Sequence, residues 1–292
     1  MVIKHAYELI GNTPILELSS SYTNKTKIYA KLESFNLTGS VKDRPVYQII
    51  KDLYDEKKIN SNTTIIEYTS GNTGISLAAM SNIFKNRIII VMPNTMSEMR
   101  RRMISNFGAE LVLADGGMKG AKEKAYEILN NTENAIMLNQ FGSESNYKSH
   151  YKTAKEILID LPDIDAVVCG IGTGGTITGL SKYFKSIGKD IKIFGVEPSE
   201  SPLLTKGEAG LHKIQGIGAN FVPPLVDKSL IDKIFTVSSD EAIKYQNMLV
   251  KNEGVSLGIS SGAALCGAVE VSKKYNFKKI LIICPDAGDR YL

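Results

Sequence analysis

The sequence contains few of the residues that make metal sites and disulfides: three cysteines, three histidines and no tryptophan. Cys169, Cys266 and Cys284 form no C-x-x-C pair and stand among apolar or small residues. We therefore expect buried, reduced thiols and a cytoplasmic chain. The histidines are scattered without the spacing of metal ligands, so we expect no metal ion. These features argue against a zinc enzyme and against a secreted module held together by disulfides.

The chain also lacks long apolar runs and a strong excess of charge. No apolar run approaches the ~18 residues of a membrane span, and residues 1–5 contain no apolar stretch typical of a secretory signal. Lys and Arg number 35 against 31 Asp and Glu, and residues 100–102 form the only compact basic run, which we interpret as a solvated helix face. Neither a nucleic-acid partner nor an anionic membrane partner is therefore indicated.

What the chain does contain is a regular alternation of strand and helix patterns over 292 residues, enough for one large domain or two modest ones. The strand candidates are mostly continuous apolar runs, as in strands buried on both faces of a parallel sheet. The pattern predicts an α/β chain with parallel sheets. We expect strands over residues 27–33, 64–68, 87–92, 110–114, 165–169, 192–196 and 279–284. We expect helices near residues 42–57, 73–85, 97–107, 118–130, 174–187, 239–252 and 261–275.

Two segments show little helix or strand pattern, and one helix start is explicit. Residues 142–149 are where the chain could pass between two sheets, and residues 199–230 form a connection long enough to carry function. Ser238 and Glu241 have the spacing of a capping box, which predicts the beginning of a helix there.

The first candidate site is a glycine-rich turn at residues 170–176, which follows an expected strand and opens an expected helix. Backbone N–H groups in such a turn, with the positive end of the helix dipole, form a cradle for a phosphate. Thr173 and Thr176 add hydroxyl groups. The turn also fits G-x-G-x-x-G, and Glu197 ends the next strand about 20 residues further on, as in dinucleotide sites. A nicotinamide-dependent oxidoreductase is therefore an alternative.

Two further segments stand at the beginnings of helices. Residues 69–74 offer small hydroxyl side chains and free amides that suit a carboxylate, although ordinary N-caps use the same residue types. Lys42 follows Gly39 at the start of a helix, where the helix dipole should lower its pKa, as an amine nucleophile requires. A phosphate cradle, a carboxylate loop and a lysine of low pKa together favour a pyridoxal-phosphate enzyme that acts on an amino acid.

At these motifs the chain resembles the fold type II pyridoxal-phosphate enzymes, specifically the cysteine synthase and cystathionine β-synthase group. Seven motifs in the same order carry the resemblance from one end of the chain to the other. They are residues 10–14, 39–44, 69–73, 139–141, 172–176, 213–219 and 258–262.

The resemblance implies an α/β fold of the tryptophan synthase β type, with two twisted, mainly parallel sheets flanked by helices. Residues 37–143 would form a small mobile substrate-binding domain, and residues 144–292 with 1–36 a large cofactor-binding domain. It also implies a homodimer and, as a further partner, a serine acetyltransferase.

In that family Lys42 would hold the pyridoxal phosphate, be displaced by the substrate and then remove the α-proton. A β-leaving group departs to give an aminoacrylate, to which a nucleophile adds. In cysteine synthase these groups are acetate from O-acetylserine and then sulfide. The family's cofactor contacts fall on Lys42, Asn72, Gly172, Thr173, Gly174, Gly175, Thr176 and Ala287. Its substrate contacts fall on Thr69, Ser70, Gly71, Thr73, Gln140 and Gly216.

The sequence departs from the family at several of these positions. Ala287 stands where most members have a serine that faces the pyridine nitrogen, so no side-chain donor is available there. Tyr68 and Leu37 replace prolines, and Asn220 replaces a glycine. These changes concern the choice of leaving group and nucleophile, and they leave the choice of cofactor unchanged.

Four hypotheses follow from the sequence. Cysteine synthase comes first, because residues 213–219 resemble that subgroup. Related β-replacements come second: formation of cystathionine, lanthionine or diaminopropionate, or release of hydrogen sulfide from cysteine. The nicotinamide-dependent oxidoreductase is third. The fourth is a ligand-binding member without activity, which Ala287 brings into consideration.

Overall fold

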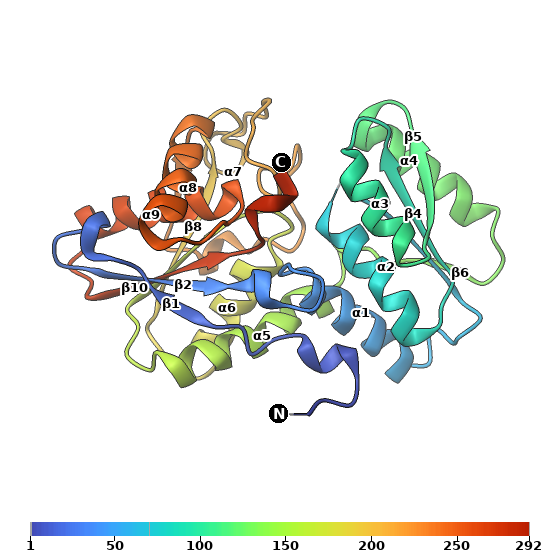
Figure 1. Ribbon diagram of the computed structural model, residues 1–292, viewed down its shortest axis with the longest axis horizontal. Coiled ribbons are helices and arrows are strands. Elements are labelled where there is room, and N and C mark those ends of the chain that lie inside the picture. The colour runs from blue at the N-terminus through green and yellow to red at the C-terminus, as the bar shows by residue number, and fades with distance from the viewer. Residues whose placement is uncertain (1, 70, 292) are drawn as a thin grey trace.

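The computed structural model describes residues 2–69 and 71–291, and it places two sheets in two lobes lying side by side (Figure 1). The six-stranded sheet has the order β1-β2-β10-β7-β8-β9, and the four-stranded sheet has the order β5-β4-β3-β6. β1 and β2 pair antiparallel, whereas the other pairs of these sheets are parallel. The expected α/β fold with two mainly parallel sheets flanked by helices is confirmed.

The six-stranded sheet contains β1 (Ile15–Glu17), β2 (Lys27–Leu32), β7 (Ala166–Gly170), β8 (Lys192–Pro198), β9 (Lys233–Val237) and β10 (Lys279–Cys284). The four-stranded sheet contains β3 (Thr64–Tyr68), β4 (Ile88–Pro93), β5 (Glu110–Ala114) and β6 (Ala135–Met137). The helices are α1 (Asp43–Asp55), α2 (Asn72–Phe84), α3 (Glu98–Asn106), α4 (Gly117–Asn130), α5 (Glu144–Asp160), α6 (Gly175–Ser186), α7 (Leu203–Lys206), α8 (Ser239–Glu253) and α9 (Ile259–Lys274).

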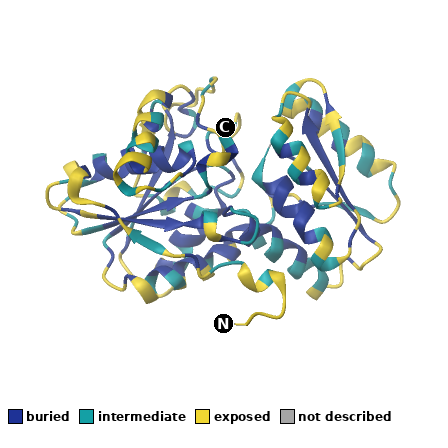
Figure 2. Ribbon diagram, in the orientation of Figure 1, coloured by how far each residue is buried: buried dark blue, intermediate teal, exposed yellow. Residues whose placement is uncertain are grey.

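Both sheets are buried on both faces, which explains their continuous apolar runs. In β10, Ile280 and Ile282 pack into one core cluster, while Leu281 and Ile283 pack into the cluster on the opposite face. Figure 2 shows the central strands of both lobes as buried, with exposed residues on the outer helix faces and the loops.

The seven strands and seven helices expected from the sequence are all present, with ends that differ by a few residues. The strands β1, β6 and β9 and the helices α5 and α7 were not predicted from the sequence. α5 begins inside residues 142–149, and it does lead the chain from the four-stranded to the six-stranded sheet. It escaped notice because its buried face is largely polar and includes Asn146, Ser149, His150 and Thr153.

Two smaller expectations are confirmed. The Ser238 side chain accepts from the backbone N–H of Glu241, and the Glu241 carboxylate accepts from the backbone N–H of Ser238. Helix α8 therefore begins with a capping box. Cys169, Cys266 and Cys284 are free and buried, and burial raises the pKa of each thiol to about 12. Within residues 2–69 and 71–291, no helix is long and apolar enough to span a membrane.

Candidate active site

The candidate residues gather where parallel strands of both sheets end, the usual location of ligand sites in open α/β sheets. Residues 69–71 follow β3, residues 171–174 follow β7, and residues 285–287 follow β10. Backbone contacts join the last of these segments to the residues just before Lys42. The Val41 N–H donates to the Pro285 carbonyl over 2.8 Å, and Ser40 forms an isolated antiparallel bridge with Asp286.

The glycine-rich turn after β7 leads directly into α6, so its backbone amides lie at a helix N-terminus. Gly174 is the N-cap and has φ of +84°, a left-handed conformation that favours glycine. A Cβ on Gly172 would lie 2.4 Å from the carbonyl oxygen of Gly216. The close approach of these two loops therefore requires glycine at position 172, and it brings the 213–219 segment against the turn.

Helix α5 supports this turn from the side with buried polar groups. Asn146 Nδ2 donates to the Thr173 hydroxyl at 3.3 Å and to the Gln140 carbonyl at 2.7 Å. The Thr176 hydroxyl lies 3.2 Å from His150 Nε2. Burial, with the charge of Arg44 as a second cause, lowers the pKa of His150 to about 3, so the imidazole is neutral. Sequence reasoning missed both α5 residues because it identified no helix there.

Lys42 is the N-cap of α1 and is partly buried. Desolvation lowers the pKa of its amine to about 8, and the nearby Asp286 carboxylate acts in the opposite direction. The fall expected from the sequence therefore has a different main cause, because burial outweighs the neighbouring acid. An amine with this pKa is partly deprotonated near neutral pH, as a nucleophile or a base requires.

A buried ionic network fixes the helix that begins beside Lys42. Arg44 Nε lies 2.6 Å from Glu33, and Arg44 Nη2 lies 2.7 Å from Glu156. Lys31 Nζ lies 2.9 Å from the same Glu156 carboxylate. Glu33 has 0% side-chain exposure, so removing one partner would leave uncompensated buried charge. The network thus joins α1 to β2 and α5.

The loop after β3 presents its groups at the N-terminus of α2. Thr69 is buried, and its hydroxyl accepts from the Gly71 N–H at 3.3 Å. The Thr73 hydroxyl donates to Gln140 Oε1 at 2.7 Å, so the structure brings Thr73 and Gln140 together. Ser70 lies outside the described residues.

Asn72 joins this loop to the C-terminal turn of the chain. Asn72 Nδ2 donates to Asp286 Oδ2 at 2.6 Å, and the Asn72 amide oxygen accepts from Arg290. The Tyr291 hydroxyl donates to the same Asp286 oxygen at 2.6 Å. Burial raises the pKa of Asp286, while Tyr291 and Asn72 act against that rise. The sequence patterns assigned no role to Asp286, so these contacts are found only in the structure.

Arg100 connects the four-stranded lobe to the six-stranded lobe beside these loops. Its Nη2 donates to Gln215 at 2.7 Å, and its guanidinium carbon lies 5.7 Å from the centre of the Tyr291 ring. A Cβ on Gly71 would lie 3.8 Å from that same carbon. Arg100 was interpreted from the sequence as part of a solvated helix face. That interpretation is wrong, because only 8% of this residue is exposed.

Ala287 provides no polar side chain, and its backbone forms an isolated bridge with Leu257. Among the described residues, the position that carries a serine in most family members therefore offers only a methyl group.

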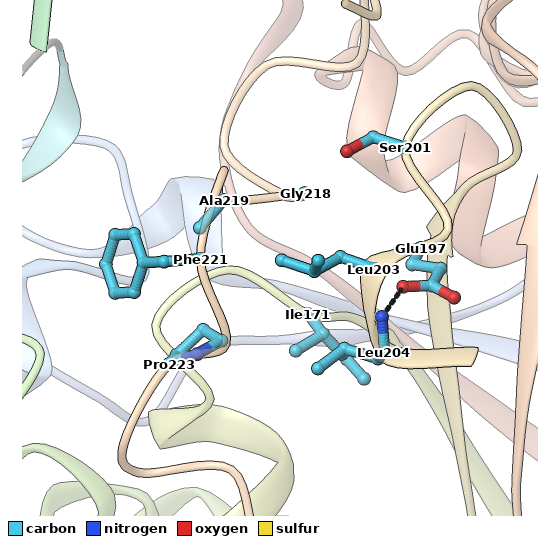
Figure 3. A pocket seen from close by; sticks show the side chains of 9 residues that line it. All are labelled: Ile171, Glu197, Ser201, Leu203, Leu204, Gly218, Ala219, Phe221 and Pro223. Carbon is cyan, nitrogen blue, oxygen red and sulfur yellow. Dashed lines mark hydrogen bonds between the residues drawn. The ribbon is translucent and has the colours of Figure 1, made fainter. Parts of the chain in front are cut away.

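Glu197, the residue that a dinucleotide site would need, is occupied in another way. Its carboxylate accepts from the backbone N–H of Leu204 at 2.7 Å and from that of Thr205 at 3.0 Å, at the start of α7. Figure 3 shows Glu197 turned to Leu204 at one side of a cavity, which Phe221 and Gly218 also line. This cavity has a volume of about 10 Å³, room for about one water molecule.

Comparison with known proteins agrees with this arrangement. Residues 6–286 match the family model described as "Pyridoxal-phosphate dependent enzyme". The chain belongs to this family. It is 50% identical to cysteine synthase B of Campylobacter jejuni, over 98% of this chain and 95% of that protein.

Solved structures extend the similarity. A cysteine synthase from Entamoeba histolytica superposes with a TM-score of 0.96 at 38% identity, covering 100% of this chain and 89% of that one. A hydrogen sulfide-producing enzyme from Fusobacterium nucleatum gives a TM-score of 0.95 at 41% identity and covers 100% of both chains. The resemblance inferred from the motifs is confirmed, the cofactor is pyridoxal phosphate, and the nicotinamide alternative is set aside.

The site's own residues fit that cofactor. The glycine turn at the N-terminus of α6 suits its phosphate, and the amine of Lys42, with a pKa of about 8, suits its aldehyde. Ala287 is the exception, because a methyl group cannot donate to a pyridine nitrogen.

Proposed function

We propose that this protein is a cysteine synthase, which exchanges the acetate of O-acetylserine for sulfide. The observation that carries the proposal is that hydrogen bonds join the loops assigned to cofactor and substrate. Asn72 bonds to Asp286 at 2.6 Å, and Asn146 bonds to Thr173 at 3.3 Å and to the Gln140 carbonyl at 2.7 Å. The names of the relatives from Campylobacter jejuni and Entamoeba histolytica support the same reaction.

Within this proposal the chain's residues divide the work between cofactor and substrate. Pyridoxal phosphate supplies an electron sink for the charge left when the α-proton departs. Lys42 holds the cofactor covalently and, once displaced, takes the α-proton on its amine. The residues proposed to hold the cofactor are Asn72, Gly172, Thr173, Gly174, Gly175, Thr176 and Ala287. Those proposed to hold the substrate are Thr69, Ser70, Gly71, Thr73, Gln140 and Gly216.

The geometry favours a carboxylate at the second group of residues. The Thr73 hydroxyl and the Gln140 amide are already in contact, and α2 begins at Asn72, so the positive end of its helix dipole lies on this side. An α-carboxylate placed here would also be close to Arg100, which lies beside Gly71. Each charge-assisted contact of this kind contributes roughly 1.5–3 kcal/mol.

A related β-replacement that releases hydrogen sulfide from cysteine is the second candidate. The observation in its favour is the Fusobacterium nucleatum enzyme, which produces hydrogen sulfide and matches this chain over 100% of both lengths. Formation of cystathionine, lanthionine or diaminopropionate belongs to the same class of reaction and differs in the nucleophile.

The deciding experiment offers O-acetylserine, O-phosphoserine, serine and cysteine separately to the cofactor-loaded protein, with and without sulfide. Cysteine formed from O-acetylserine and sulfide supports the proposal. Hydrogen sulfide from cysteine, with no reaction of O-acetylserine, supports the second candidate. Spectral binding without turnover of any of the four would identify a ligand-binding member and contradict both.

The proposal includes an assembly and a location. We propose a cytoplasmic homodimer in which residues 37–143 move relative to residues 144–292 with 1–36. Free buried cysteines suit a reducing compartment. Leu9 and Phe35 are exposed apolar residues, 46% and 64% respectively, on segments joined by a bond from the Gly11 N–H to Asn36, and they suit a subunit contact. Light scattering tests the dimer, and co-purification tests a serine acetyltransferase partner.

A further inference from the structure

Behind the proposed substrate loop lies a buried carboxyl group for which the reaction has no assigned use. Glu67 is the fourth residue of β3, and only 1% of it is exposed. Its Oε1 accepts from the Gln140 side-chain amide at 3.4 Å. Its Oε2 is buried and has no hydrogen-bond partner within the described part of the chain. A polar atom left in this way needs an explanation.

Gln140 is held from three directions, and Glu67 provides one of them. The Thr73 hydroxyl donates to the amide oxygen of Gln140 at 2.7 Å, which leaves the amide nitrogen on the side of Glu67. Asn146 donates to the backbone carbonyl of Gln140 at 2.7 Å. The preceding residue, Asn139, has φ of +57°, a conformation that few residues other than glycine adopt. The segment that presents Gln140 is therefore tightly constrained.

The surroundings of Glu67 disfavour its charge. Burial raises the pKa of its carboxyl to about 8, and among the described residues the neutral donors of Asn139 and Gln140 oppose this rise. The ionisable group coupled to it is Tyr68, whose pKa is raised by burial first and then by the charges of Glu67 and Tyr126. Tyr68 is therefore neutral where Glu67 titrates, and it adds no counter-charge.

If the carboxylate of a substrate binds to the Gln140 amide, a single amide group separates it from the carboxyl group of Glu67. An ionised Glu67 would therefore repel it. We propose that Glu67 is a positioning residue that directs the Gln140 amide and must carry its proton for the substrate α-carboxylate to bind. This inference rests on the proposed function, because that function places the carboxylate at Gln140. Two negative charges in one buried site repel each other. Binding of the substrate carboxylate therefore favours the protonated form of Glu67.

Proton uptake by the wild-type protein provides the first test. Propionate carries a carboxylate but no amine and no leaving group, and its binding to the cofactor-loaded enzyme is measured by calorimetry in buffers of different ionisation enthalpy. We expect no proton uptake at about pH 6.5 and uptake approaching one proton at about pH 9.5. Binding without uptake at the higher pH would overturn the inference alone. Failure to bind at either pH would instead overturn the assignment of this loop to a carboxylate.

The second test compares Glu67→Gln with Glu123→Gln, the same substitution at an exposed position on α4. In the wild type and the control, propionate affinity should fall by up to about tenfold per pH unit above about pH 8. In Glu67→Gln the affinity and the proton count should not vary over this range, because an amide does not titrate. In the cofactor-loaded enzyme the Lys42 amine is engaged in its proposed covalent bond to the cofactor. Unchanged proton uptake in Glu67→Gln would therefore assign the effect to another group and refute the inference.

Discussion

Replacing Glu67 by glutamine should make the protein more resistant to alkaline unfolding, and the structure gives the size of the effect. In the unfolded chain this carboxyl ionises near its ordinary value of 4.5, whereas burial raises the pKa to about 8 in the folded protein. Folding therefore keeps a proton that the unfolded chain loses. Stability contributed by the neutral acid is present below pH 4.5 and is lost as the pH rises to about 8.

The pKa difference corresponds to about 5 kcal/mol in total, since each unit is about 1.36 kcal/mol. Between about pH 5.5 and about pH 8.5 the wild type should lose about 3 kcal/mol relative to Glu67→Gln. A glutamine side chain introduces its own cost or gain at this buried position, but that offset is the same at every pH. The pH dependence of the difference is therefore the quantity that reports the buried acid.

The assay is urea unfolding of the apoprotein at several pH values, without cofactor so that ligand binding does not contribute. Glu123→Gln serves as the control, since its carboxyl is exposed on α4. A constant difference between wild type and Glu67→Gln, within about 0.5 kcal/mol, would mean that Glu67 has an ordinary pKa in the folded protein. The argument for its neutral state would then fail.

Three further predictions concern the proposed division of the site. Lys42→Ala should bind no cofactor covalently, measured by mass spectrometry after borohydride reduction, and should show no turnover; a label on another lysine would contradict this. Gln140→Ala should raise KM for the amino acid by about ten- to a hundredfold with unchanged cofactor content, whereas lost cofactor would assign Gln140 to the wrong ligand. Glu197→Gln should destabilise the fold by about 1–3 kcal/mol without loss of cofactor, and NAD should not raise Tm.

The sequence was sufficient for those parts of the site that depend on local patterns. Gly172 and Gly174 are recognisable because a strand, a glycine turn and a helix follow one another within a few residues. Lys42 is recognisable because it stands at the beginning of a helix. In each case neighbouring residues determine both the conformation and the chemistry, so a single window of sequence contains the signal.

The remaining groups depend on contacts between distant segments. The role of Asp286 depends on its contact with Asn72, which is 214 positions away in the chain. The role of Glu67 depends on its contact with Gln140, which is 73 positions away. A glutamate within an apolar strand does carry a local signal, because burial of an acid is costly. Its partner, however, is known only once β6 lies beside β3. Helix α5 was not predicted from the sequence for a related reason. Hydrophobic periodicity cannot identify a helix whose buried face carries amides and hydroxyls.

The two buried carboxyl groups of the site have opposite relations to charge, and this difference separates their roles. Burial lowers the pKa of Lys42, and the charge of Asp286 opposes that fall. Burial raises the pKa of Asp286, and the charges of Arg290 and Arg100 oppose that rise. Within the part of the chain that the structure describes, the groups that act on Glu67 are neutral donors. The carboxylate of Asp286 can therefore stabilise a positive charge on Lys42. Glu67, in contrast, allows an anion to bind nearby because it remains neutral. Protonating Asp286 would weaken the support of the Lys42 ammonium, and ionising Glu67 would weaken binding of the carboxylate.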